Sequence, residues 1–320
     1  MKNVIFFCHK EEGYMKYATR INSFRRFDKD VLRALESIGT IDGVDYVDLN
    51  YPEHFSDCGV EAVRKKLEES GLRCNAINLR FRDEFINGEF GNRDRAVSEK
   101  AVRLCREAAG VCRELGGDQM IIWLGFDGFD YSFQLDYVEC WDRLVKAFRE
   151  VCENADVPVS IEYKPYEERV HAFVDSFGTT LSIVQEVGKE NLGITLDFCH
   201  MLMKKENPAM AAAWLLAHKK LYNIHLNDGE GSMDDGLMVG TVNFWKTMEV
   251  MYYLKKYDFQ GVVYFDTFPK REKAVEECAA NVAMCRKIES MIDAYGMDRI
   301  SDVIAQNDAV AVCNMMAEML

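Results

Sequence analysis

Four short apolar segments of this chain each end in a side chain that can bind a metal ion or move a proton. They are Ser160-Ile161-Glu162, Thr195-Leu196-Asp197, Asn223-Ile224-His225 and Tyr264-Phe265-Asp266. A charged group at the end of a buried segment is costly unless it is paired or metal-bound. Three carboxylates and one imidazole at the same level of a fold suit a hard or borderline divalent cation such as Mn²⁺, Mg²⁺, Co²⁺ or Zn²⁺. The alternative is that the carboxylates bind loop amides or pair with Lys164, Arg80 and Lys270.

Apolar patterning predicts the elements that bring these side chains together, because short β-type segments alternate with longer amphipathic helical segments. The expected strands are 4–8, 44–49, 73–79, 119–124, 157–162, 192–197, 221–226 and 261–266, and the expected helices are 28–38, 57–70, 96–115, 135–155, 179–188, 208–218, 242–256 and 270–295. Near-continuous apolar strands are typical of a parallel sheet that is buried on both faces. These units predict a closed (β/α)8 TIM barrel in residues 1–298, with functional side chains at the carboxyl ends of its strands.

The barrel has one competing fold, and the end of the chain leaves one alternative open. A doubly wound open sheet would use the same elements, but no Gly-x-Gly-x-x-Gly turn follows the first expected strand. Residues 299–320 continue as a C-terminal helical extension. This extension either caps the barrel or contacts a second subunit, and we expect a homo-oligomer, a dimer or a tetramer.

Composition narrows the class of partner. The 320 residues carry 53 acidic and 39 basic side chains, a net charge of -14, which argues against nucleic acid because phosphates need a basic face. No apolar run is long enough for a membrane helix, and the first one is too short for a signal peptide. The eleven cysteines are scattered and include no C-x-x-C pair. Reduced thiols in a cytoplasmic protein are therefore expected.

Several motifs resemble one branch of a known family. Glu162-Tyr163-Lys164-Pro165, Asp197-x-x-His200, His225-x-Asn227 and Asp234-Asp235-Gly236-Leu237 are similar to segments of the L-rhamnose isomerase-like branch of the xylose isomerase-type barrels. The stretch 123–128 with Tyr131 and Gln134 resembles the segment after strand four in that branch, and Gly88, Asn92, Asp94 and Arg95 resemble the segment after strand three. The likeness covers roughly residues 73–270, and the segment before it matches poorly.

The resemblance implies a set of metal ligands. Glu162, Asp197, His225 and Asp266 take the places of the four residues that hold one divalent metal in that family, for which Mn²⁺ is the expected ion. His200 and Asp234 match two ligands of a second metal, whereas Gly236 stands where the family has a third, an aspartate. Asp235 or Asp228 could substitute for it. We therefore expect one tightly bound ion, with His200 and Asp234 contacting substrate or a weakly held second ion.

The resemblance also implies contacts with a sugar. Lys164 lies two residues from Glu162 on the same strand face, where it can hold a sugar oxygen; its alternative role is a salt bridge. Trp123 can stack on a sugar or belong to the core, and Gln134 is a candidate substrate contact beside it. His54, after the second strand, can donate a proton or bind the open-chain substrate, or it can lie in a surface loop. His9 can line the pocket or bind a loop.

The function expected from these residues is metal-dependent interconversion of an aldose and a ketose by hydrogen transfer between C1 and C2. Glu162, Asp266, Lys164 and His200 are the expected catalytic groups. A ketose 3-epimerase is the first alternative, although the resemblance gives that branch a glutamate where this chain has Asp266. A subunit that cleaves C-glycosides is a further alternative. A phosphodiesterase of the endonuclease IV kind is remote, because six histidines and a net charge of -14 suit neither a three-zinc cluster nor a basic groove.

Overall fold

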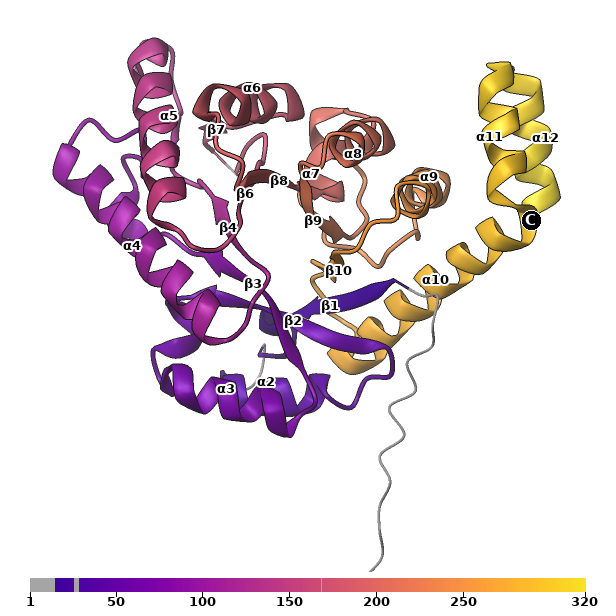
Figure 1. Cartoon of the computed structure of the whole chain (residues 1–320), viewed down its shortest axis with the longest axis horizontal. Helices are drawn as coiled ribbons and strands as arrows, with labels where there is room; N and C mark the ends of the chain where they lie inside the picture. The colour runs from indigo at the N-terminus through magenta and orange to yellow at the C-terminus, as the bar shows by residue number, and fades with distance from the viewer. Residues whose placement is uncertain (1–14, 26–28, 168) are drawn as a thin grey trace, which may run out of the picture.

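The computed structural model describes residues 15–25, 29–167 and 169–320. Within them, parallel strands close a barrel in the order β1-β10-β9-β8-β6-β4-β3-β2 (Figure 1). These strands are β1 (Lys16–Arg20), β2 (Val44–Tyr51), β3 (Arg73–Leu79), β4 (Gln119–Trp123), β6 (Val159–Glu162), β8 (Leu192–Asp197), β9 (Leu221–Leu226) and β10 (Val262–Phe265). The predicted (β/α)8 barrel is confirmed.

The first strand of the barrel differs from the expected one. The segment 4–8, together with His9, lies outside the described residues. The strand that pairs with both β10 and β2 is β1, which the patterning missed. Its sequence, Lys-Tyr-Ala-Thr-Arg, has charged ends and a polar threonine, so it has no apolar run. It is nevertheless buried from Tyr17 to Thr19, because its neighbours cover both faces.

Helices pack around the outside of the strands (Figure 1). They are α2 (Val31–Ile38), α3 (Gly59–Glu69), α4 (Arg95–Glu114), α5 (Tyr137–Asn154), α6 (Phe177–Val187), α7 (Phe198–Lys204), α8 (Pro208–Ala217), α9 (Phe244–Lys256) and α10 (Ala274–Tyr295), with short turns α1 (Ile21–Phe24), η1 (Glu53–Phe55) and η2 (Asp83–Phe85). Side-chain caps fix several starts: the Asp136 carboxylate accepts hydrogen bonds from the backbone N–H groups of Val138 and Glu139 at the start of α5. Every expected helix has a counterpart within a few residues.

The C-terminal extension forms two helices, α11 (Met297–Gln306) and α12 (Ala309–Met319). Figure 1 shows them as a hairpin at the far end of α10, standing away from the barrel strands. Arg299 Nη2 lies 3.0 Å from Glu318 Oε2 and joins the two helices. None of the residues of α12 is buried, although eight of its eleven residues are alanine, valine or methionine. No helix in the described part of the chain is long and apolar enough to cross a membrane.

Loops at the carboxyl end of the barrel are fixed by two buried carboxylates. Asp127 accepts hydrogen bonds from the backbone N–H groups of Glu89, Phe90 and Gly91, at 2.8–3.0 Å. Glu89 in turn accepts from the backbone N–H of Phe126 at 3.0 Å. A further two-stranded pair, β5 (Gly128–Phe129) with β7 (His171–Ala172), lies beside them. The loops after β3 and β4 are thereby tied together around the mouth of the barrel.

Candidate metal centre

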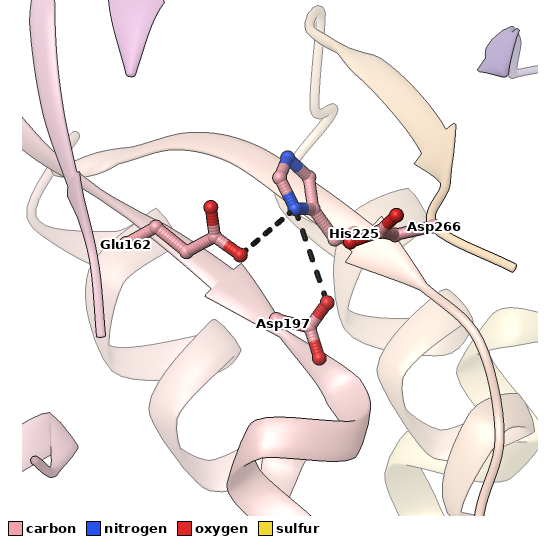
Figure 2. A group of neighbouring side chains, drawn as sticks. All are labelled: Glu162, Asp197, His225 and Asp266. Atoms are coloured by element: carbon pink, nitrogen blue, oxygen red, sulfur yellow. Dashed lines mark ion pairs between the residues drawn. The ribbon is translucent and has the colours of Figure 1, made fainter. Parts of the chain in front are cut away.

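Four side chains converge at the carboxyl ends of neighbouring strands. Glu162 ends β6, Asp197 ends β8, His225 lies near the end of β9, and Asp266 directly follows β10. One ligand atom from each lies within 4.8 Å of all the others. Figure 2 shows the His225 ring between the carboxylates, with Nδ1 3.3 Å from Glu162 Oε1 and 3.9 Å from Asp197 Oδ2. The parallel register of the barrel brings these residues together although they are spread over more than a hundred positions.

Orphaned polar atoms in this group fit a bound cation. His225 is 2% exposed, and neither of its ring nitrogens has a hydrogen-bond partner. Asp266 Oδ1 is likewise buried without a hydrogen bond, although Arg20 Nε lies 3.3 Å from it. Buried nitrogen and oxygen atoms without partners are costly. A divalent ion ligated by Glu162, Asp197, His225 and Asp266 would satisfy them, and the mix of one imidazole with three carboxylates suits Mn²⁺ and its chemical neighbours.

The pKa values of these side chains also favour a bound cation. Burial raises the pKa of Asp197 to about 7, with the Asp234, Asp266 and Glu162 carboxylates adding to the effect of burial and His200 opposing it. Burial would also raise the pKa of Glu162, but the His225 and His200 imidazoles lower it to about 2. The pKa of His225 is raised to about 9 because the surrounding carboxylates outweigh its burial. The crowded carboxylates therefore demand positive charge, which protonated imidazoles supply when no metal is bound.

Asn227 holds two members of the group in place. Its Nδ2 donates to Asp197 Oδ1 and Oδ2 at 3.3 and 3.1 Å, and to the backbone carbonyl of Asp266 at 3.2 Å. Its Oδ1 accepts from the backbone N–H of Cys199 at 2.8 Å. Asp197 Oδ1 also accepts from the backbone N–H of His200, at 2.9 Å, at the start of α7. These hydrogen bonds fix the direction in which the Asp197 carboxylate points.

A second group of possible ligands contains Asp197, His200 and Asp234. The His200 Nδ1–H donates to the backbone carbonyl of Tyr163 at 2.9 Å, which leaves Nε2 facing Asp234 Oδ2 at 3.3 Å. Lys164 Nζ lies 3.1 Å from the same oxygen and 2.6 Å from Glu167 Oε1. Asp234 Oδ2 thus already lies between an imidazole and an ammonium group.

The position of Gly236 has no room for the carboxylate that the family pattern would place there. A Cβ atom on Gly236 would lie 2.4 Å from the Phe268 ring, and its φ of +58° is in the left-handed region. Asp228 does not replace it, because its carboxylate accepts from the backbone N–H groups of Gly229, Val242 and Asn243 and from Asn243 Nδ2. Asp235 Oδ2 accepts from the backbone N–H of Glu230 at 2.8 Å. Both aspartates stabilise the loop after β9.

A cavity of about 620 Å³ opens above the two groups. Of the residues expected to contact a substrate, Trp123, Lys164, His200 and Asp234 line it, as do the ligand candidates Glu162 and Asp266. The full lining is Arg20, Arg80, Trp123, Glu162, Lys164, Tyr166, Glu167, His200, Met203, Ser232, Met233, Asp234, Asp266 and Phe268. Lys164 Nζ lies 5.5 Å from the centre of the Trp123 ring, so these two residues share one wall.

Two expected substrate contacts lie elsewhere. His54 is 1% exposed; its Nδ1 accepts from the backbone N–H of Asn50, and its Nε2–H donates to Asn22 Oδ1, both at 2.9 Å. Gln134 is exposed, and its Oε1 accepts from the backbone N–H groups of Asp130 and Tyr131. Both side chains are used in holding loops and do not line the cavity.

The cavity lining also includes two arginines that the sequence analysis did not assign to the substrate. Arg20 is the last residue of β1 and Arg80 directly follows β3. Inspection of the residues at the end of each strand led to the metal group. The same inspection also identifies both arginines. Arg20 was missed because β1 was missed, and Arg80 was considered only as a partner for the carboxylates.

Comparison with known proteins agrees with the barrel fold described above. A family model described as a xylose isomerase-like TIM barrel matches residues 32–287. The xylose isomerase of Thermus thermophilus is 26% identical over 252 residues, which are 76% of this chain and 65% of that protein, so the chain spans slightly less than two thirds of this relative. The D-psicose 3-epimerase of Clostridium cellulolyticum H10 superposes with a TM-score of 0.66 and 15% identity, covering 86% of this chain and 99% of the other. The D-allulose 3-epimerase of a Methylomonas species does so with a TM-score of 0.69 and 17% identity, covering 86% and 98%. These two structures share the fold.

Proposed function

The chain belongs to the xylose isomerase-like TIM-barrel family, and on this premise we propose that it is a metal-dependent isomerase that interconverts an aldose and a ketose. The observation that carries the proposal is the buried group of Glu162, Asp197, His225 and Asp266, whose ligand atoms lie within 4.8 Å of one another and include buried atoms without hydrogen bonds. Two members of this group also line a cavity large enough for a monosaccharide. Mn²⁺ is the ion we propose.

The residues around the cavity have separate roles in this proposal. Glu162, Asp197, His225 and Asp266 would hold a divalent ion, which would supply the positive charge needed to polarise a sugar carbonyl and to lower the pKa of the neighbouring hydroxyl. The Lys164 ammonium, fixed by Asp234 and Glu167, donates a hydrogen bond to a sugar oxygen. His200, held by the Tyr163 carbonyl, presents its Nε2 to the same region. Glu162 and Asp266 can accept or return the proton where hydrogen moves between C1 and C2 as a proton rather than as a hydride.

A ketose 3-epimerase is the second candidate. The observation that favours it is the origin of Glu162 and Asp266, which come from β6 and β10 and are separated in the barrel by β8 and β9. An epimerase needs two carboxylates on opposite faces of the substrate, and this arrangement brings carboxylates to the metal group from two sides. The short Asp266 side chain is the feature that favours the isomerase.

One experiment separates the two reactions. The metal-loaded protein is incubated in deuterated water with a panel of free aldoses and ketoses, and the products are followed by nuclear magnetic resonance. An isomerase converts ketose to aldose, whereas an epimerase yields a second ketose and incorporates deuterium at C3. If no sugar in the panel changes in the presence of Mn²⁺, the proposed function is wrong.

We also propose that the chain forms a homo-oligomer through α11 and α12. The exposed side chains of this hairpin include Ile304 at 41% exposure, Val310 at 66% and Leu320 at 88%, and an apolar face of this kind is typical of a subunit contact. Light scattering of the whole chain and of a chain ending at Tyr295 tests this. The whole chain is expected to be a dimer or tetramer and the shortened chain a monomer. The same number of subunits in both would contradict the proposal.

A further inference from the structure

Two arginines reach the cavity from strands that carry none of the four metal-group residues. In the closed order of the barrel, β1 lies opposite β6 and β3 lies opposite β9. Arg20 at the end of β1 and Arg80 after β3 therefore reach the cavity from the side opposite the strands that carry Glu162 and His225. The two guanidinium groups differ in their surroundings. The strand β1 is the neighbour of β10, and Arg20 Nε lies 3.3 Å from Asp266 Oδ1, whereas the neighbours of β3 are β2 and β4, which carry none of the four metal-group residues.

Arg80 is the cation of this cavity for which the described residues supply no ion pair, although its positive charge helps to lower the pKa of the nearby Glu162. Lys164 pairs with Asp234 and Glu167, and Arg20 Nε lies 3.3 Å from Asp266 Oδ1. Across residues 15–25, 29–167 and 169–320, Arg80 forms no ion pair; its guanidinium carbon lies 5.4 Å from the centre of the Trp123 ring. A half-buried guanidinium group without an anionic partner is unfavourable in the free protein. Its contact with the indole face holds it in the cavity.

The neighbouring arginines show that this lack of a partner is specific to Arg80. Arg25 and Arg82, on the nearby loops, both pair with Glu53, at 3.1 and 2.7 Å. The chain as a whole has a net charge of -14, so acidic partners are plentiful elsewhere. His54 is also kept neutral there, because burial together with Arg25, Arg80 and Arg20 lowers its pKa to about 3 despite the opposing effect of Glu53. The surroundings of Arg80 therefore contribute positive charge and leave its guanidinium group open to the cavity.

We infer that the substrate of this site is a sugar acid whose carboxylate is bound by Arg80 on the side of the cavity opposite the metal group. The inference rests on the proposed function and narrows its substrate class. The planar guanidinium group matches a carboxylate with two parallel hydrogen bonds. A phosphate is a poorer match, because one unpaired cation balances one negative charge and the lining includes no glycine to bring backbone N–H groups close to it.

The test compares sugars that differ only at C6: D-glucose, D-glucuronate and D-glucose 6-phosphate, with the corresponding galactose series, all with the Mn²⁺-loaded protein. Both turnover and equilibrium binding by calorimetry are measured. The uronates are expected to show a kcat/KM about 10- to 100-fold above that of the neutral sugars, the range of a charge-assisted hydrogen-bonded pair. Arg80→Met should remove this preference through KM, with kcat for the uronate little changed, because the carboxylate lies away from the reacting carbons.

Two further variants make the result specific. Arg80→Lys keeps the charge and should restore part of the preference. Arg82→Met is the matched control: Arg82 belongs to the same loop but pairs with Glu53 and does not line the cavity, so the preference should be unchanged.

The outcomes separate this inference from the proposed function. Turnover of neutral sugars as well as uronates, with no effect of Arg80→Met on the ratio, would overturn the inference and leave the isomerase intact. A preference for the 6-phosphates would overturn the choice of carboxylate. Binding of uronates that depends on Arg80, without turnover of any sugar, would support the inference and overturn the isomerase. Equal binding of all three sugars, or binding of none, would overturn the inference.

Discussion

Replacing Asn227 by alanine should weaken metal binding without removing a metal ligand. The side chain donates to both oxygens of Asp197 and to the Asp266 carbonyl, and it accepts from the Cys199 N–H. Its loss leaves buried backbone groups without partners, at about 1–3 kcal/mol for each group that water does not reach. We expect the free energy of unfolding of the metal-free protein to fall by about 2–4 kcal/mol. We expect Mn²⁺ affinity to fall about 10- to 100-fold, because the Asp197 carboxylate is no longer oriented.

The assay pairs urea unfolding in chelator with calorimetric titration of Mn²⁺. Asn191→Ala is the control, since Asn191 Nδ2 donates to the backbone carbonyls of Cys152 and Ala155 at 3.0 and 3.4 Å. Asn191 directly precedes β8, at the opposite end of the strand that ends in Asp197. This variant should lose stability but keep the wild-type Mn²⁺ affinity. Wild-type Mn²⁺ affinity in Asn227→Ala, or an equal loss of affinity in both variants, would show that Asn227 does not orient the metal ligands.

Three other predictions follow from individual contacts. Gly236→Asp should destabilise the protein by about 2 kcal/mol or more and should create no second tight Mn²⁺ site, because the Phe268 ring fills the space and the backbone has positive φ; two tight sites in calorimetry would contradict this. His200→Ala should lower sugar turnover strongly while metal analysis still finds one Mn²⁺ per chain, since His200 is not one of the four ligand candidates of the first group; unchanged turnover would exclude a catalytic role. Burial is the main cause that lowers the pKa of His54 to about 3 in the folded protein. As the pH falls below about 6.5, the histidine of the unfolded chain is therefore protonated first. The stability that His54 contributes above that pH is lost progressively as the pH falls toward 3. Between pH 7 and 4.5 the wild type should therefore lose about 2 kcal/mol more of its unfolding free energy than His54→Gln; parallel losses in urea titrations would show that His54 titrates normally.

Patterns that depend on neighbours in the sequence predicted most of the fold. The apolar strands β4 and β8 and the capped helix α5 are visible in this way because their burial follows from their own residues. The strand β1 is not, since a Lys-Tyr-Ala-Thr-Arg segment becomes a barrel strand only through pairing with β10 and β2. Local propensity cannot show such pairing.

The same distinction applies to the site. The rule that parallel strands end at one level places Glu162, Asp197, His225 and Asp266 together, and the structure does so. The burial of His54 away from the cavity could not be predicted. It depends on Asn22, which is 32 positions away and accepts a hydrogen bond from the His54 Nε2–H. The obstruction at Gly236 likewise arises from Phe268, on a different loop. Contacts between distant loops are set by tertiary packing, which one sequence does not display.

The assignment of the metal centre is tested by titrating Mn²⁺ into chelator-treated wild type and Asp197→Ala. We expect one tight site per chain in the wild type and no tight site in Asp197→Ala, because that variant loses a ligand that belongs to both groups. Tight binding of Mn²⁺ by Asp197→Ala at the wild-type stoichiometry would contradict the assignment of the metal centre.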